Sequence, residues 1–256
     1  HRTSLSSSMY LLKVVIEKPS VLQYVLTSIL FSSNTYILMV ISGGQMGVAL
    51  AYAMTPFVLA HYIKLIDHKG IIGEKIQQAI IAGFVLAIQV MFDPRIAYLA
   101  LICVGIYAGY AIFLYVSSFK KFLSLFFSNI FFGCGFSFVC ALLLHAVWVV
   151  PLFFVRSLSV SQESINVEGF RFFSFSDFSH SVSLLHPNWP ENIFGKVYFL
   201  KSEFILLPIL AYISLLFIHV KSAILMERAI DRRLLFFAIL GIIGVFLAKG
   251  VHEPFG

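Results

Sequence analysis

Seven long apolar runs constrain this chain more than any other feature of its sequence. They cover about 20–41, 46–66, 76–92, 96–116, 133–155, 203–220 and 234–248. A helix of about 20 mostly apolar residues crosses the hydrocarbon core of a bilayer. Charged residues make up only 12% of the chain, about half the share found in soluble domains, so a water-exposed surface could not be covered. The sequence therefore predicts an all-α, polytopic transmembrane bundle of about seven spans.

The basic residues predict the orientation of this bundle. Of the 18 lysines and arginines, 12 lie in or beside the chain start and the loops near 67–75, 117–122 and 221–233, together with 5 of the 12 acids. Cytoplasmic connections of membrane proteins carry such an excess of Lys and Arg. We therefore expect these segments in the cytoplasm, the N-terminal end of the chain on the same side, and the C-terminal end outside a plasma membrane. Because the basic residues are distributed according to the predicted sides of the membrane, the net positive charge of the chain does not indicate a nucleic-acid partner.

Two connections are predicted to have structure of their own. The segment 156–202 is the longest polar one, and its aromatics and prolines favour an ordered extracytoplasmic loop; a connection of that length is uncommon unless it is functional or disordered. Residues 118–132 and the span that follows them are together too long for a single crossing, so an interfacial helix is predicted over 118–132. The chain is expected to be one transmembrane domain, 1–256, and an internal piece of a larger protein.

Several residues expected near the outer surface could contact a polar ligand. Gln45 lies in a glycine-rich turn and could face either a ligand or water. Asp93 and Arg95 flank a proline, so they could hold a phosphate through Arg95 or form a turn with a local ion pair. His145 lies within an expected span, where ionisable residues are candidates for function, although a satisfied packing role is the alternative.

The expected outer loop and the chain end supply the remaining candidates. Trp189 could stack on a sugar, while His186 and Glu191 could orient hydroxyls or move protons; a structured loop cap is the alternative. Lys249 could pair with a lipid phosphate as a point charge, or it and Glu253 could be ordinary charges beside the membrane. No spacing of Cys and His indicates a metal site, and a requirement for a divalent metal stays open.

Five short motifs resemble a known family. They are Phe31-Ser32-Ser33-Asn34-Thr35-Tyr36, Gly43-Gly44-Gln45-Met46-Gly47, Ala51-Tyr52-Ala53-Met54-Thr55-Pro56, Ala146-Val147-Trp148-Val149-Val150-Pro151 and Lys249-Gly250-Val251-His252-Glu253-Pro254-Phe255-Gly256. Together they resemble segments of GT-C-type polytopic membrane glycosyltransferases, and those of the arabinofuranosyltransferase D type in particular. Thr35 departs from the pattern, because the family often has proline there.

The resemblance implies transfer of a sugar from a polyprenyl-phosphate donor to a glycan or protein acceptor outside the cytoplasm, as part of building the cell envelope. In such enzymes an acidic residue in the first outer loop is the general base. This chain is expected to begin after that loop, so no catalytic residue is assigned.

Two other functions remain open at this stage. A transporter or lipid flippase would need polar residues aligned in several spans, together with inverted repeats and broken helices. The polar residues within the expected spans are few and no repeat is visible. A membrane scaffold without catalytic activity would instead present the long outer loop to a partner.

Overall fold

The computed structural model describes residues 2–16, 18–115, 119–154, 182, 206, 208–213 and 232–248. These residues form helices and no strand. The chain divides into two compact units, which are described separately. Unit 1 comprises His1–Ser32 and Gly44–Ser157, and unit 2 comprises Ser33–Gly43 and Leu158–Gly256.

Four helical stretches of unit 1 are long and apolar enough to cross a membrane. They are α4 (Met46–Ile66), α5 (Ile72–Phe92), residues Pro94–Phe113 of α6 (Pro94–Tyr115), and the continuous stretch Ser124–Leu144. These helices indicate a membrane protein. The first three coincide with the expected spans at 46–66, 76–92 and 96–116 and differ from them only at their ends.

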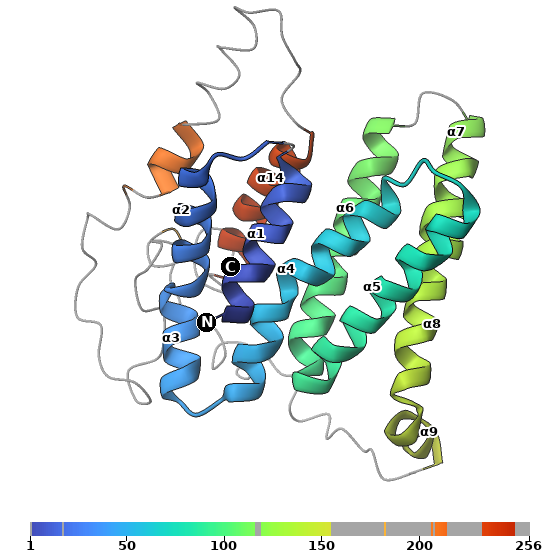
Figure 1. Ribbon diagram of the computed structural model, residues 1–256, viewed down its shortest axis with the longest axis horizontal. Coiled ribbons are helices and arrows are strands. Elements are labelled where there is room, and N and C mark those ends of the chain that lie inside the picture. Colours follow the sequence, from blue (N-terminus) through green and yellow to red (C-terminus); the bar gives the residue numbers. More distant parts are fainter. Residues whose placement is uncertain are drawn as a thin grey trace, which may run out of the picture. The chain divides into compact units, whose positions relative to one another are not determined.

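Helix α4 lies at the centre of unit 1 (Figure 1). It packs against α5, α6 and the N-terminal helix α1 (Arg2–Val15), and most of its residues are buried. Pro56 lies inside α4 without ending it. Membrane helices tolerate such a proline because neighbouring groups satisfy the backbone oxygen that it leaves unpaired.

Helix α1 has no counterpart among the expected spans. Its buried residues include Ser4, Ser7 and Ser8, and Ser8 Oγ donates to Ser28 Oγ of α2 (Val21–Ser32) at 3.4 Å. Small side chains let helices approach closely inside a membrane protein, but they carry no apolar signal in the sequence. At 1.5 Å per residue, Arg2 lies roughly 20 Å from Val15 along the axis. The side of the membrane on which the chain start lies stays a prediction.

The first expected span, 20–41, is two helices. Ser20 begins α2 with a capping box, in which Gln23 N donates to Ser20 Oγ and Ser20 N donates to Gln23 Oε1 at 2.8 Å. After Ser32 the chain leaves the helical conformation, and Asn34 Oδ1 accepts a hydrogen bond from Ile37 N at the start of α3 (Thr35–Ser42). The interruption therefore occurs within the polar sequence Ser32-Ser33-Asn34-Thr35.

The interfacial helix expected over 118–132 is corrected by the structure. The short helix α7 (Phe119–Leu123) runs into the π-helix η1 (Ser124–Cys134), which continues into α8 (Gly135–Leu144). Ser124–Leu144 is 21 residues long and apolar, so the span expected at 133–155 begins earlier, at Ser124. It ends at His145, where the chain bends into α9 (Ala146–Phe154).

Close packing of α5 on α8 depends on Gly83. A Cβ atom at this position would lie 2.5 Å from the Ser137 carbonyl oxygen and 2.9 Å from Cys140 Cβ. Ser137 Oγ is also buried and donates to Tyr62 Oη of α4 at 2.9 Å. Helices α4, α5 and α8 are thereby held together around one contact region.

Unit 2 is described in part. Helix α14 (Arg232–Ala248) covers the expected span 234–248, and Tyr212 Oη donates to the carbonyl oxygen of Ala238 in α14 at 3.1 Å. Most of the expected span 203–220 and all of the expected loop 156–202 except residue 182 lie outside the described residues. The count of seven spans and the outer loop therefore stay predictions.

Candidate functional site

Three connections of unit 1 meet at one end of its helices, which we name the Gly44 end. They are the turn before α4, the α5–α6 connection at Asp93, and the break between α8 and α9 at His145. Gly47 in the first turn of α4 lies against the carbonyl oxygen of Phe92 at the end of α5. His145 Nε2 lies 2.8 Å from the carbonyl oxygen of Ala87, and Figure 1 shows α9 at this end as well.

The turn at Gly44 presents Gln45 to the surroundings. Gly44 has a φ of 73°, a left-handed conformation that glycine adopts without steric cost. Met46 N donates to the Gly44 carbonyl oxygen at 3.0 Å, and the exposed Gln45 precedes α4 without forming a side-chain cap. The structure therefore has the tight turn that the glycines predicted, with an amide side chain that a ligand can reach.

Asp93 begins helix α6. Its Oδ1 accepts hydrogen bonds from the backbone N–H groups of Arg95 and Ile96 at 2.8 and 3.3 Å, and Pro94 occupies the first helical position, where its missing N–H costs nothing. The Arg95 guanidinium donates to the same carboxylate, with Nη2 2.7 Å from Oδ2. This hydrogen bonding holds the pKa of Asp93 below its ordinary value.

Of the two alternatives for Asp93 and Arg95, the structure thus contains the turn with the local ion pair. The Asp93 side chain is 8% exposed, whereas that of Arg95 is 78% exposed. An anion can therefore approach the guanidinium from the surroundings, but Asp93 is committed to its partners.

His145 joins three helices by two hydrogen bonds. Trp148 Nε1 donates to His145 Nδ1 at 2.8 Å. Because an indole nitrogen can only donate, Nδ1 is the acceptor and the proton of the neutral ring lies on Nε2, which donates to the Ala87 carbonyl oxygen. The satisfied packing role is therefore the one the geometry supports for His145. The ring links α9 and the end of α8 to α5.

A polar contact missed by the sequence analysis lies deeper in the same bundle. Gln89 of α5 is fully buried, and its Nε2 donates to the Ala51 carbonyl oxygen at 3.0 Å and to Thr55 Oγ1 at 2.8 Å, both on α4. Its Oε1 is buried with no hydrogen-bond partner among the described residues. The sequence showed a glutamine in an apolar run but not the helix that it faces.

The opposite end of unit 1, which we name the Asp67 end, has its own polar contacts. Tyr107 Oη donates to Asp67 Oδ2 at 2.8 Å, and Asn129 Nδ2 donates to the carbonyl oxygens of Ile66 and His68. The two bonds from Asn129 satisfy backbone oxygens at the end of α4 and directly after it. Lys64 Nζ donates to Tyr10 Oη at 2.8 Å and lies over its ring.

The chemistry available at the Gly44 end is binding rather than proton transfer. The amide of Gln45 and the guanidinium of Arg95 are accessible, whereas Asp93 and His145 are engaged in structural hydrogen bonds. Among the described residues no group of three or more His, Cys, Asp or Glu side chains could hold a metal ion. The remaining predicted residues, His186, Trp189, Glu191, Lys249 and Glu253, lie outside the described part of the chain.

Comparison with known proteins identifies no relative of this chain. No protein-family model, no curated protein and no solved structure matches it.

Proposed function

We propose that this chain is the membrane-embedded part of a glycosyltransferase that transfers a sugar from a polyprenyl-phosphate donor to an extracytoplasmic glycan or protein acceptor. The observation that supports the proposal is the meeting of three connections at the Gly44 end of unit 1. Two of them contain motifs that resemble the GT-C-type enzymes, namely the turn at Gly44 and the Trp-x-x-Pro stretch from Trp148 to Pro151. A shared substrate-binding mouth would need this arrangement.

In this proposal the residues at the Gly44 end bind and orient. The Arg95 guanidinium, which is largely exposed, pairs with the donor phosphate, since a planar fork of N–H donors matches phosphate oxygens. Gln45 donates to a sugar hydroxyl through its amide. His145 and Trp148 hold α9 in place at the mouth.

The general base of the proposed reaction is none of these residues. Asp93 accepts from Arg95 and from two backbone N–H groups, so its carboxylate is turned into the fold and stabilised as an anion. A base must reach an acceptor hydroxyl within hydrogen-bond distance. The base is therefore expected in a part of the protein other than the Gly44 end. Transfer measured with and without a divalent metal tests whether the reaction requires one.

The test is sugar transfer by the full-length protein in membranes supplied with a polyprenyl-phosphate sugar. We expect the Arg95→Gln variant to raise KM for the donor by roughly tenfold, because a charged hydrogen bond to phosphate is lost. The Lys69→Gln variant, which removes a cation from the Asp67 end, should leave transfer unchanged. Absence of transfer by the wild-type protein with any polyprenyl-phosphate sugar tested would count against the proposal, as would equal activity of Arg95→Gln.

A transporter or lipid flippase is the second candidate, and one specific observation favours it. The first apolar run is interrupted between α2 and α3, and the fourth long stretch changes from π-helix to α-helix and then breaks at His145. Discontinuous helices are how transporters place unpaired backbone groups around a substrate. Uptake or lipid scrambling by reconstituted vesicles, in the absence of a sugar donor, would favour this function over sugar transfer.

A further inference from the structure

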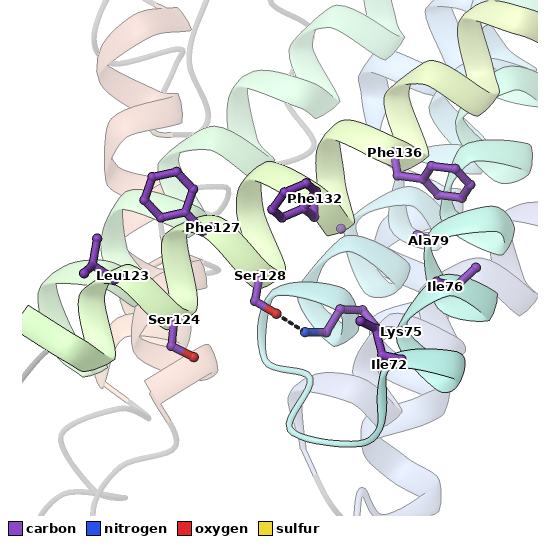
Figure 2. A pocket seen from close by; sticks show the side chains of 11 residues that line it. Ile72, Lys75, Ile76, Ala79, Leu123, Ser124, Phe127, Ser128, Phe132 and Phe136 are labelled. Atoms are coloured by element: carbon purple, nitrogen blue, oxygen red, sulfur yellow. Dashed lines mark hydrogen bonds between the residues drawn. The ribbon is translucent and has the colours of Figure 1, made fainter.

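A groove lies between the first half of α5 and the continuous stretch formed by η1 and α8, near the Asp67 end of unit 1. Its volume is about 490 Å³, and 11 residues line it. Figure 2 shows the side chains of α5 on one wall and those of η1 on the other. This size is within the range of pockets that bind small molecules.

The polar lining residues lie in the part of the groove nearer the Asp67 end, among the apolar Ile72, Leu123 and Phe127. Lys75, Ser124 and Ser128 are the three, and Lys75 Nζ donates to Ser128 Oγ across the groove (Figure 2). Farther along the same two helices the walls are apolar, with Ile76, Phe132 and Phe136. The groove therefore has a basic, hydroxyl-bearing head region and a hydrocarbon-like continuation.

Lys75 has no acidic partner within 4.0 Å among the described residues. The neighbouring carboxylate, that of Glu74, is turned toward His68 and Gly70. The ammonium group of this half-buried lysine can therefore pair with an anion that enters the groove. Phosphate is the anion that a lysine beside two hydroxyls can hold by hydrogen bonds.

The π-helix shapes this groove. Phe127, Ser128 and Phe132 all come from η1, and such wide turns in a helix are frequent at functional sites. Phe127 and Phe132 are exposed by 47% and 64%, which suits aromatic side chains in contact with lipid. Gly133 adds no side chain to the groove wall.

We propose that this groove binds one anionic phospholipid of the surrounding bilayer. Its phosphate pairs with Lys75 and accepts from Ser124 and Ser128, and one acyl chain lies along Ile76 and Phe136. The groove changes from polar to apolar along the axes of α5 and of the continuous stretch η1–α8. Both helical stretches are long and apolar enough to cross a membrane. A phospholipid in a bilayer has the same direction, with its headgroup at the end of the helices.

Native mass spectrometry of the full-length protein tests this site. Protein in detergent is titrated with phosphatidylglycerol as the anionic probe and with phosphatidylcholine as the zwitterionic one. We expect one phosphatidylglycerol to stay bound after washing that removes phosphatidylcholine. Lys75→Gln should weaken this binding roughly fivefold, as expected for one basic residue at an anionic headgroup, and Lys69→Gln, at the same end but outside the groove, should not.

A second pair of variants tests occupation of the groove without changing charge. Ser124→Phe fills the head of the groove, whereas Ile80→Phe adds a phenyl group to an exposed position of α5 outside it. Only Ser124→Phe should displace the lipid, with gel filtration confirming that both variants are folded. The proposal is overturned by equal retention of the two lipids, by equal loss in Lys75→Gln and Lys69→Gln, or by displacement of phosphatidylglycerol by inorganic phosphate at millimolar concentration.

Discussion

Three polar side chains of this apolar bundle have defined structural partners. Asp93 begins α6, His145 bridges α9 and α5, and Asn129 satisfies two carbonyl oxygens at the end of α4. An unpaired polar group buried away from water costs about 1–3 kcal/mol. The same geometry removes Asp93 and His145 from the list of groups that could transfer protons and leaves Gln45 and Arg95 as the accessible ones.

Asp93 gives the structure a dependence on acid. Folding lowers its pKa below the ordinary value of 3.8, so its stabilising effect is complete above that value and is lost as pH falls through the folded pKa. We expect Asp93→Asn to be less stable than wild type at pH 7 by about 0.5 kcal/mol, because the exposed Arg95 is screened by solvent. The difference should become smaller as pH falls below 3.8.

Thermal unfolding in detergent at pH 7 and pH 3 measures this effect. Glu74→Gln is the matched control, since its side chain is 61% exposed. A difference between wild type and Asp93→Asn that stays constant over this range would contradict the assignment of Asp93 as an ionised helix-initiating residue.

At the residue scale the sequence predicts only what is local. The turn at Asp93-Pro94-Arg95 and the positive φ of Gly44 follow from residue types within a few positions of one another. Ala87, which His145 contacts on α5, is 58 residues away in the chain. Thr55 and Ala51, which Gln89 contacts on α4, are 34 and 38 residues away. These pairings depend on how the helices pack, so a single sequence does not determine them.

At the element scale, hydrophobicity locates helices well where polar residues bound them. Helix α4 lies between the Gly44 turn and Asp67, and the predicted span 46–66 coincides with it. The stretch 118–144 was predicted less well, because no charged residue occurs between Phe122 and Leu144 to mark where a span begins. Helix α1 was missed, because the buried residues of its first half, Ser4, Ser7 and Ser8, are serines.

The contact between α5 and α8 leads to a prediction at this scale. Gly83→Ala should destabilise the protein by about 2 kcal/mol, because the added methyl group would meet the Ser137 backbone and overpacking a tight contact has a cost of that order. Gly105→Ala is the matched control in α6, where a Cβ would meet nothing within 4 Å. There the alanine should stabilise the helix by about 1 kcal/mol.

Denaturant or thermal unfolding of both variants in the same detergent gives the two free-energy differences. A Gly83→Ala variant as stable as wild type would mean that α5 and α8 are farther apart than described. Equal changes in the free energy of unfolding for Gly83→Ala and Gly105→Ala would mean that helix propensity alone, and not the contact with α8, determines the effect at position 83.

At the scale of the whole molecule, the sequence correctly predicts that the described part of the chain is helical, with helices able to cross a membrane. The four long stretches of unit 1 place Gln45, Asp93 and His145 at one end and Asp67 and Lys75 at the other. The total number of spans and the side of the membrane that each end faces stay predictions. The number of spans is predicted from the apolar runs. The sidedness is predicted from the distribution of lysine and arginine, which acts through the membrane and its insertion machinery rather than through packing within the chain.

Cysteine labelling of intact cells tests the central claim, that the Gly44 end faces the outside and the Asp67 end faces the cytoplasm. Cys103, Cys134 and Cys140 are replaced by serine, and single cysteines are introduced by Gln45→Cys and Lys69→Cys, both at exposed positions. A membrane-impermeant maleimide should label position 45 in intact cells and position 69 only after permeabilisation. Labelling of both positions in intact cells, or of position 69 alone, would contradict the account.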